Sequence, residues 1–342
     1  MGLARVEITI IGAGVTGLAV ARALRDRGAD LRIVERGDGA APGPQACSWW
    51  AGGMLAPHCE GESAEEPVVR LGQEAAGWWE AATGCVTRAG SLVVSPARDQ
   101  ADLRRFSQRT SGFEPVDEAQ IAALEPDLEG RFTKGLYFPS EAHLDPRAAL
   151  TTLRTRLEAE GVAFETREAD PTQEAKRALT IDCRGLSARA AMDGLRGVKG
   201  EMLVLRCPDV ALTRPIRLLH PRIPLYIVPR GEGLYMLGAT MIEAGAGKHP
   251  SARALLELLS GAYALNPAFG EAEVLEIGVD ARPAFADNLP RISRKGRLIS
   301  VNGLYRHGFL LAPAMARMVA AMLYDETTPE VLHEDRVKRR TA

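Results

Sequence analysis

Apolar and polar residues alternate in blocks at the start of the chain, and their order predicts a strand, a helix and a second strand. Residues 6–11 are largely apolar, as in a strand buried in a parallel sheet. Residues 18–27 form a helical run that Gly28 ends, and residues 31–34 are a second apolar run that stops at Glu35. This order is typical of the opening of an α/β domain.

The middle of the chain has a different pattern, in which short strands succeed one another. Antiparallel-type strands are predicted for residues 199–205, 225–230 and 234–240, and residues 274–282 are expected to be extended. Helices are predicted for residues 64–82, 98–110, 117–124, 145–160, 251–264 and 310–323. Further strands are predicted for residues 90–95, 162–165, 179–185 and 297–303, and residues 135–139 are expected to be extended. The helix–strand pair ending at 165 suits the first parallel sheet.

This order predicts a Rossmann-like α/β domain interrupted by an α+β substrate domain with a mainly antiparallel sheet. We assign residues 1–60, 134–195 and 278–330 to the discontinuous nucleotide-binding domain. Residues 61–133 and 196–277 are assigned to the substrate-binding domain, and residues 331–342 to a tail, where Lys338, Arg339 and Arg340 suggest a solvated end.

The turn between the first strand and helix has the spacing of a dinucleotide-binding loop. Gly12 allows a tight turn, Gly14 lets backbone N–H groups approach a pyrophosphate, and Gly17 lets the helix pack close to the strand. Glu35 stands where a carboxylate accepts hydrogen bonds from ribose hydroxyls, and an acid there argues against a 2′-phosphate. The alternative is a glycine turn in an α/β sheet that binds no nucleotide.

Composition excludes several classes of function. The 342 residues are 46% apolar, and a net charge of −2 suggests neither a nucleic acid nor an anionic membrane as partner. The five cysteines show no paired spacing, which is typical of reduced thiols in a cytoplasmic protein, and we expect no metal site. The chain enters its first strand too early for a signal peptide, and no apolar run is long enough to span a membrane.

Residues 46–57 combine two adjacent tryptophans, Trp49 and Trp50, with a run of small residues. The tryptophans suit a hydrophobic core. Small residues beside a nucleotide site also let a planar ring lie against the backbone. We therefore expect this segment to contact a cofactor ring.

Taken together, these motifs resemble the FAD-dependent amino-acid oxidases of the D-amino-acid oxidase/sarcosine oxidase superfamily, and most of all the glycine oxidases of thiamine biosynthesis. The resemblance covers nearly the whole chain. It rests on residues 12–17 with Glu35, 51–55, 198–201, 226–230, 238–241, 282–283 and 306–313. The chain departs from this pattern at Trp49-Trp50, at His307, where Asn is common, and in a short segment between Phe164 and Leu179.

The resemblance implies that FAD binds extended across the first domain. No cysteine comes after Arg282-Pro283 in the place of the covalent flavin cysteine of sarcosine oxidases, so we expect FAD to be non-covalent. The cofactor-binding residues it implies are Gly12, Ala13, Gly14, Val15, Thr16, Gly17, Glu35, Arg36, Cys47, Ser48, Gly52, Gly53, Met54, Ala169, Gly185, Leu304, Tyr305, His307, Gly308, Phe309 and Leu310.

Oxidation of an amino acid requires that its carboxylate be held, and the planar fork of arginine binds both carboxylate oxygens. With the resemblance, Arg282 is the expected clamp, although a structural ion pair would also explain an arginine there. Tyr226 is the expected second donor, against the alternative that it is only a core tyrosine. Arg306 is expected near the substrate rather than as a plain surface arginine, and Met241 in the pocket rather than in the core. We assign no certain catalytic residue, because a base role for His307 is less expected than a backbone contact to the flavin.

The implied reaction is hydride transfer from Cα to flavin N5, with the imine hydrolysed to a keto acid and ammonia and with O2 reduced to hydrogen peroxide. A secondary amino acid such as sarcosine, or an N-carboxymethyl amine, is an alternative substrate. A flavin-binding protein without amine turnover is a third alternative. A homo-oligomer and transfer of the imine to a thiazole synthase are compatible with the resemblance.

Overall fold

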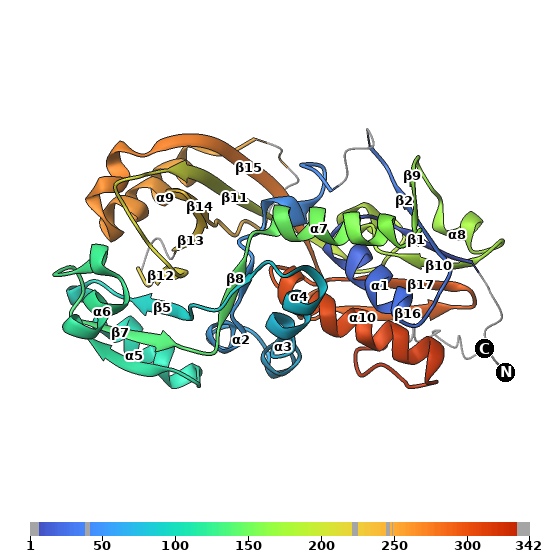
Figure 1. Cartoon of the computed structure of the whole chain (residues 1–342), viewed down its shortest axis with the longest axis horizontal. Coiled ribbons are helices and arrows are strands. Elements are labelled where there is room, and N and C mark those ends of the chain that lie inside the picture. Colours follow the sequence, from blue (N-terminus) through green and yellow to red (C-terminus); the bar gives the residue numbers. More distant parts are fainter. Residues whose placement is uncertain (1–6, 38–41, 221–224, 244–246, 248, 334–342) are drawn as a thin grey trace, which may run out of the picture. The chain divides into compact units, whose positions relative to one another are not determined.

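The computed structural model describes residues 7–37, 42–220, 225–243, 247 and 249–333 (Figure 1). The chain divides into two compact units. The first unit comprises Met1–Gln45, Leu150–Arg196 and Arg282–Ala342, and the second comprises Ala46–Ala149 and Gly197–Ala281.

The division differs slightly from the expected domains at Arg196, which belongs to the first unit, and at residues 278–281, which belong to the second. The larger difference is at residues 46–60 and 134–149, which also belong to the second unit. The reason is a small sheet that was not predicted from the sequence. In it, Met54 and Leu55 pair with His143 and Ala142, which joins these two segments to each other. Residues 331–333 also differ from the expected tail, because they hydrogen-bond to Ile292. Residues 334–342 lie outside the described residues.

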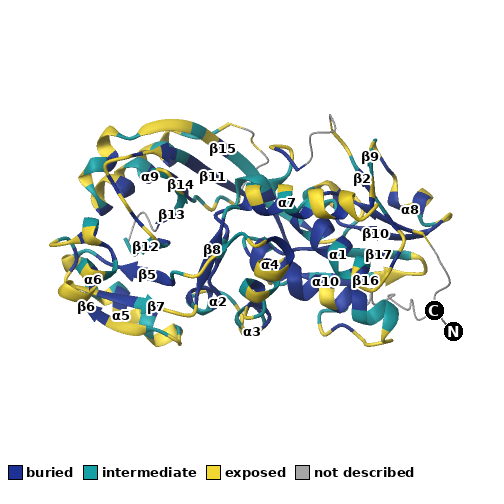
Figure 2. Cartoon of the chain, viewed as in Figure 1, coloured by how far each residue is buried: buried dark blue, intermediate teal, exposed yellow. Residues whose placement is uncertain are grey.

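The sheet of the first unit is parallel apart from one edge strand. In spatial order its strands are β16 (Arg291–Lys295), β17 (Leu298–Asn302), β10 (Leu179–Asp182), β1 (Ile8–Ile11), β2 (Leu31–Glu35) and β9 (Ala163–Thr166). Every residue of β1 and β10 is buried, as expected for central parallel strands (Figure 2). The predicted addition of strand 162–165 is confirmed, because β9 pairs with β2 in parallel. The sequence missed β16, which forms a hairpin with β17.

Two helices of the first unit pack against each other, α1 (Val15–Arg25) and α10 (Gly308–Tyr324). Helix α10 is apolar nearly all round and is largely buried over its first three turns (Figure 2). The other helical elements of this part of the chain are α7 (Pro146–Ala159), which begins in the second unit, α8 (Pro171–Glu174) and η4 (Gly185–Ala188).

The second unit is built on a large, mainly antiparallel sheet, as predicted. Its strands in spatial order are β15 (Glu273–Ala284), β11 (Arg196–Arg206), β14 (Leu234–Gly238), β13 (Leu225–Gly231), β12 (Ile216–Leu218), β5 (Ser91–Val94), β7 (Lys134–Phe138) and β6 (Glu114–Asp117). Only the β12–β5 pair is parallel among the pairings described. A further small sheet has the order β3 (Met54–Leu55), β8 (Ala142–Leu144) and β4 (Val86–Thr87).

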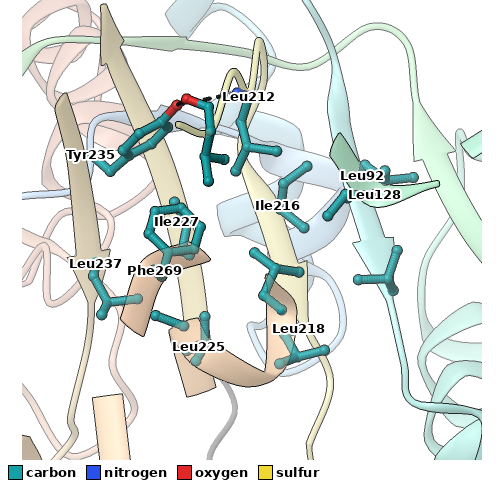
Figure 3. Close-up of a cluster of buried hydrophobic side chains, with 14 of the residues drawn as sticks. Leu92, Leu128, Leu212, Ile216, Leu218, Leu225, Ile227, Tyr235, Leu237 and Phe269 are labelled. Atoms are coloured by element: carbon teal, nitrogen blue, oxygen red, sulfur yellow. Dashed lines mark hydrogen bonds between the residues drawn. The ribbon is translucent and has the colours of Figure 1, made fainter. Parts of the chain in front are cut away.

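Helix α9 (Ala252–Leu265) and the short helix η5 (Pro267–Glu271) help to cover one face of the large sheet and enclose its core (Figure 3). Alternate strand residues such as Leu225, Ile227 and Leu237 contribute to this core. Tyr235 is also buried there, and its hydroxyl donates to Val210 O and accepts from Leu212 N. The residues between them, such as Tyr226, therefore face the other side of the sheet.

The remaining helices of the second unit connect the strands. They are η1 (Cys47–Trp50), α2 (Pro57–Glu60), α3 (Glu66–Gly72), α4 (Ala75–Thr83), η2 (Ala97–Asp99), α5 (Gln100–Arg109), α6 (Glu118–Leu124) and η3 (Pro126–Leu128). The single helix expected at 64–82 is wrong, since α3 ends at Gly72, where glycine weakens a helix. Within the described ranges, no helix has both the length and the apolar character needed to cross a bilayer.

Candidate functional site

Two glycines at the junction of β1 and α1, one in the turn and one in the first turns of the helix, have no room for side chains. Gly12 has a φ of +106°, and a Cβ added there would lie 2.6 Å from the carbonyl oxygen of Cys183. A Cβ on Gly17 would lie 1.8 Å from the carbonyl oxygen of Gly12. The roles predicted for these two glycines, a tight turn and close helix packing, therefore agree with the local geometry.

The N-terminus of α1 is left open for an anion. Gly14 is its N-cap, and neither a side-chain cap nor an acidic residue occurs in its first turn. The first N–H groups of a helix have no partner within the helix, and its dipole favours negative charge there. This end of α1 therefore fits the pyrophosphate of a dinucleotide.

Glu35 reaches this turn from the end of β2, since its Oε2 accepts from Ala13 N at 2.6 Å. Burial raises the pKa of Glu35 above its ordinary value, against the lowering effects of the Ala13 N–H and the neighbouring Arg36. Nearby, Ala169 is buried against Ile11 and Val34. Glu35 and Ala169 therefore lie at the same end of the parallel strands, as an adenosine site requires.

Replacing Glu35 with glutamine is expected to stabilise the apoprotein at neutral pH and to weaken FAD binding about tenfold, because hydrogen bonds to a charged acceptor are lost. The folded-state pKa is raised, so ionisation of Glu35 costs stability above its unfolded pKa and costs nothing at lower pH. Thermal unfolding of the apoprotein at pH 4 and pH 7, with flavin titration at pH 7, measures both effects. A variant with unchanged FAD affinity would remove Glu35 from the cofactor site.

Residues from several elements of the first unit contact the segment that leads into α10. Tyr305 N donates to the carbonyl oxygen of Pro283 at 2.9 Å, and a Cβ on Gly308 would lie 3.3 Å from Val15 Cγ1. The side chain of Asn302 donates to the carbonyl oxygen of Gly185 at 2.9 Å. The structure thus gathers several predicted cofactor residues around the start of α10, and Leu304, Phe309 and Leu310 are buried beside them.

Arg306 and His307 are joined to each other. Arg306 Nε donates to His307 Nε2 at 3.2 Å, and the His307 ring packs edge to face with Tyr305 at 5.8 Å. This bond engages one of the two ring nitrogens of His307. His307 is also the N-cap of α10, and its expected backbone contact to the flavin stays a prediction.

In the second unit, one row across the large sheet carries a tyrosine and a glycine. Tyr226 pairs with Gly238, which pairs in turn with Met202. A Cβ on Gly238 would lie 2.8 Å from the Tyr226 hydroxyl, and a Cβ on Gly52 would lie 2.9 Å from its ring. The structure therefore brings a predicted substrate residue, Tyr226, against a predicted cofactor residue, Gly52.

Arg230 holds the backbone around Gly52. It belongs to the motif of residues 226–230, but the sequence did not predict a role for it. Its guanidinium donates to the carbonyl oxygens of Gly52 at 2.9 Å and Ala51 at 3.2 Å, and also to Leu144 O. Burial lowers the pKa of Arg230 to about 10, and the protonated form remains dominant at neutral pH. Gly53 has a φ of +71°, and a Cβ there would lie 2.2 Å from Leu144 O.

Other predicted residues are placed without being brought together. Cys47 and Ser48 lie in η1, and Arg36 is exposed beyond β2. Met241 is 52% exposed, so the alternative interpretation, in which it is a core residue, is wrong. Its expected place in the substrate pocket stays a prediction. Arg282 lies near the end of β15 in the first unit, and its convergence with Tyr226 stays a prediction.

Comparisons with known proteins agree with this geometry. The sequence matches the family described as FAD dependent oxidoreductase over residues 7–322. A Rhizobium etli protein, provisionally named thiamine biosynthesis oxidoreductase ThiO, is 53% identical over 321 residues, which cover 94% of this chain and 97% of that protein. The bifunctional protein ThiO/ThiG of Nostoc is 27% identical, over 95% of this chain and 54% of its own length.

Among solved structures, the glycine oxidase of Bacillus cereus shares the fold, with a TM-score of 0.78 at 22% identity over 96% of this chain and 99% of that chain. The N–H groups at the uncapped end of α1 can donate to a pyrophosphate, the crowded glycines leave room for it, and the Glu35 carboxylate can accept from a ribose, which fits the cofactor of the matched family. The chain therefore belongs to the FAD dependent oxidoreductase family, and FAD is its cofactor.

Proposed function

We propose that this protein oxidises glycine or a similar small amino acid and serves thiamine biosynthesis. The observation that carries the proposal is the 53% identity, over nearly the whole of both chains, to a relative named for thiamine biosynthesis. The contact between Tyr226 and Gly52 supports it, because a substrate donor must lie beside the cofactor segment. The first unit would bind FAD, and the second would supply most of the substrate site.

FAD would lie with its adenosine at Glu35 and its pyrophosphate over the turn before α1, held without a covalent bond. The flavin would be flanked by residues 47–54 and by the loop 304–310. The N-terminus of α10, which has no side-chain cap and no acidic residue in its first turn, would favour negative charge at the flavin.

Arg282 would grip both oxygens of the substrate carboxylate, and the Tyr226 hydroxyl would donate to one of them. Arg306 and Met241 would line the pocket. When bound, FAD would supply the two-electron chemistry, taking the hydride of Cα and passing the electrons to O2, which would give hydrogen peroxide. The chain's own contribution is to hold the acid and present Cα. Where no partner takes up the imine, water would convert it to a keto acid and ammonia.

A thiazole-forming partner is the proposed consumer of the imine. In Nostoc, a region that resembles this chain occupies about half of a protein named ThiO/ThiG, which indicates that the two activities can share one polypeptide. The proposed consumer of the imine formed by this chain is then a thiazole synthase of the ThiG kind.

The purified holoprotein tests the function directly. Anaerobic glycine is expected to bleach the flavin absorbance, and air is expected to restore it with one hydrogen peroxide per glyoxylate. Glycine, sarcosine, D-alanine and D-proline should be compared in the same assay. Faster turnover of sarcosine than of glycine would show that the preferred substrate is a secondary amine. If none of these amines bleached the flavin of a yellow protein, the proposed oxidase activity would be refuted.

A further inference from the structure

The adjacent tryptophans that the function leaves without a role are both covered by one arginine. The Arg147 guanidinium carbon lies 4.7 Å from the ring centroid of Trp49 and 5.2 Å from that of Trp50. Arg147 Nε also donates to the carbonyl oxygen of Trp49 at 3.4 Å. One side chain thus contacts both rings and the backbone of η1.

Arg147 is itself fixed from two sides. Its two terminal nitrogens donate to the two carboxylate oxygens of Glu276 at 2.7 and 2.9 Å, a bidentate pair that sets the plane of the guanidinium. Its backbone N–H donates to Asp145 Oδ1 at 2.7 Å, which anchors it in the first turn of α7. Helix α7 and strand β15 therefore both hold this arginine.

Strand β15 also makes room for the second tryptophan. Gly278 lies two residues beyond Glu276, on the same face of the strand. A Cβ there would lie 2.2 Å from the Trp50 ring and 2.7 Å from Met202 Sδ. Trp50 therefore rests against the sheet at a position that only glycine permits.

The segment held in this way continues directly into the predicted flavin contact. Trp50 is followed by Ala51 and Gly52, whose carbonyl oxygens bind Arg230. Arg230 thus fixes the residues after η1, and Arg147 fixes η1 itself. A shift of the tryptophans would move the backbone of residues 51–54.

We propose that Arg147 and Glu276 are positioning residues for the cofactor, which together with Trp49 and Trp50 hold residues 47–54 in the geometry that FAD binding requires. They act through the backbone and do not contact the substrate. This inference rests on the proposed function only in placing residues 47–54 beside the flavin.

Arg147→Ala is expected to raise the Kd for FAD about 10- to 100-fold, as fits the loss of a bidentate charged pair and two ring contacts. It is also expected to change the visible circular dichroism of the flavin that still binds. Arg206→Ala is the matched control, because Arg206 pairs with Glu273 at 3.2 Å across the exposed end of the same strand. FAD titration of both apoproteins, with their thermal midpoints, separates a positioning effect from loss of folding.

Arg147→Lys decides the matter where the alanine variant does not fold. A lysine keeps the charge but binds only one carboxylate oxygen at a time, so about a fivefold loss of FAD affinity is expected rather than rescue. A folded Arg147 variant whose affinity for FAD is within twofold of that of the wild type would overturn the inference. That result would leave the proposed glycine oxidation by the wild type untouched. A wild type that binds FAD but oxidises no amino acid would refute the proposed function and leave this test intact.

Discussion

Replacing Arg282 with alanine is expected to lower kcat/KM for glycine about 10²- to 10³-fold, mainly through KM, with FAD still bound. A bidentate bond to a carboxylate exists in the ground state and in the transition state, so its loss weakens both. A loss of this size in kcat/KM is also typical where a polar group in a substrate site is left without its hydrogen-bond partner. Initial rates of hydrogen peroxide formation over a range of glycine concentrations measure the effect.

Two companion variants sharpen this test. Arg282→Lys keeps the positive charge without the planar fork, so it should recover only part of the loss. Arg294→Ala, on the exposed edge strand β16 of the same unit, should leave both kinetics and FAD content unchanged. Normal KM for glycine in Arg282→Ala would assign Arg282 to a structural ion pair, and loss of FAD from that variant would assign it to cofactor binding.

The parts of the fold that the sequence predicts are those with a long or regular pattern. The parallel strands β1, β2 and β10 are short runs rich in Leu, Ile and Val, and the glycine turn after β1 marks the start of helix α1. The hairpin of β13 and β14 is marked by Gly231 and Gly233, both with positive φ. Such signals are local, and they are present in the sequence itself.

The parts that could not be predicted depend on contacts between distant residues. Strands β3 and β4 have two residues each, too few to show a period, although their pairing with β8 moves the boundary between the units. Arg147 and Glu276 are 129 positions apart, and nothing near either residue announces the pair. The glycine at 278 within a strand was the available signal, because such a glycine often marks the close approach of another group.

Glycine therefore has two distinct uses in the two units. In the first unit, crowded glycines bring a strand and a helix together so that the N–H groups of α1 are open to an anion. In the second unit, the lack of a side chain at Gly238 and Gly278 leaves space on the sheet for Tyr226 and Trp50, respectively. The first use can be recognised from a local sequence motif. The second cannot, because it depends on which strands lie next to each other in the fold.

Replacing Gly17 with alanine is expected to leave a protein that retains no FAD. The new Cβ would lie 1.8 Å from the carbonyl oxygen of Gly12, so α1 must move away from the turn that binds the pyrophosphate. Displacement of a buried helix belongs to the class of substitutions that cost about 4 kcal/mol or more. The ratio of flavin to protein absorbance after purification measures the loss, and far-ultraviolet circular dichroism reports the fold.

Gly77→Ala is the matched control for this substitution. Gly77 also lies inside a helix, α4, but a Cβ there meets no atom within 4 Å. Alanine favours a helix more than glycine does, so this variant should gain up to about 1 kcal/mol of stability and keep its flavin. Because both substitutions add the same methyl group to a helix, a difference between them isolates the steric demand at the turn. Equal flavin content in the two variants would show that α1 can shift without harm, and the glycine turn would no longer explain how the cofactor is held.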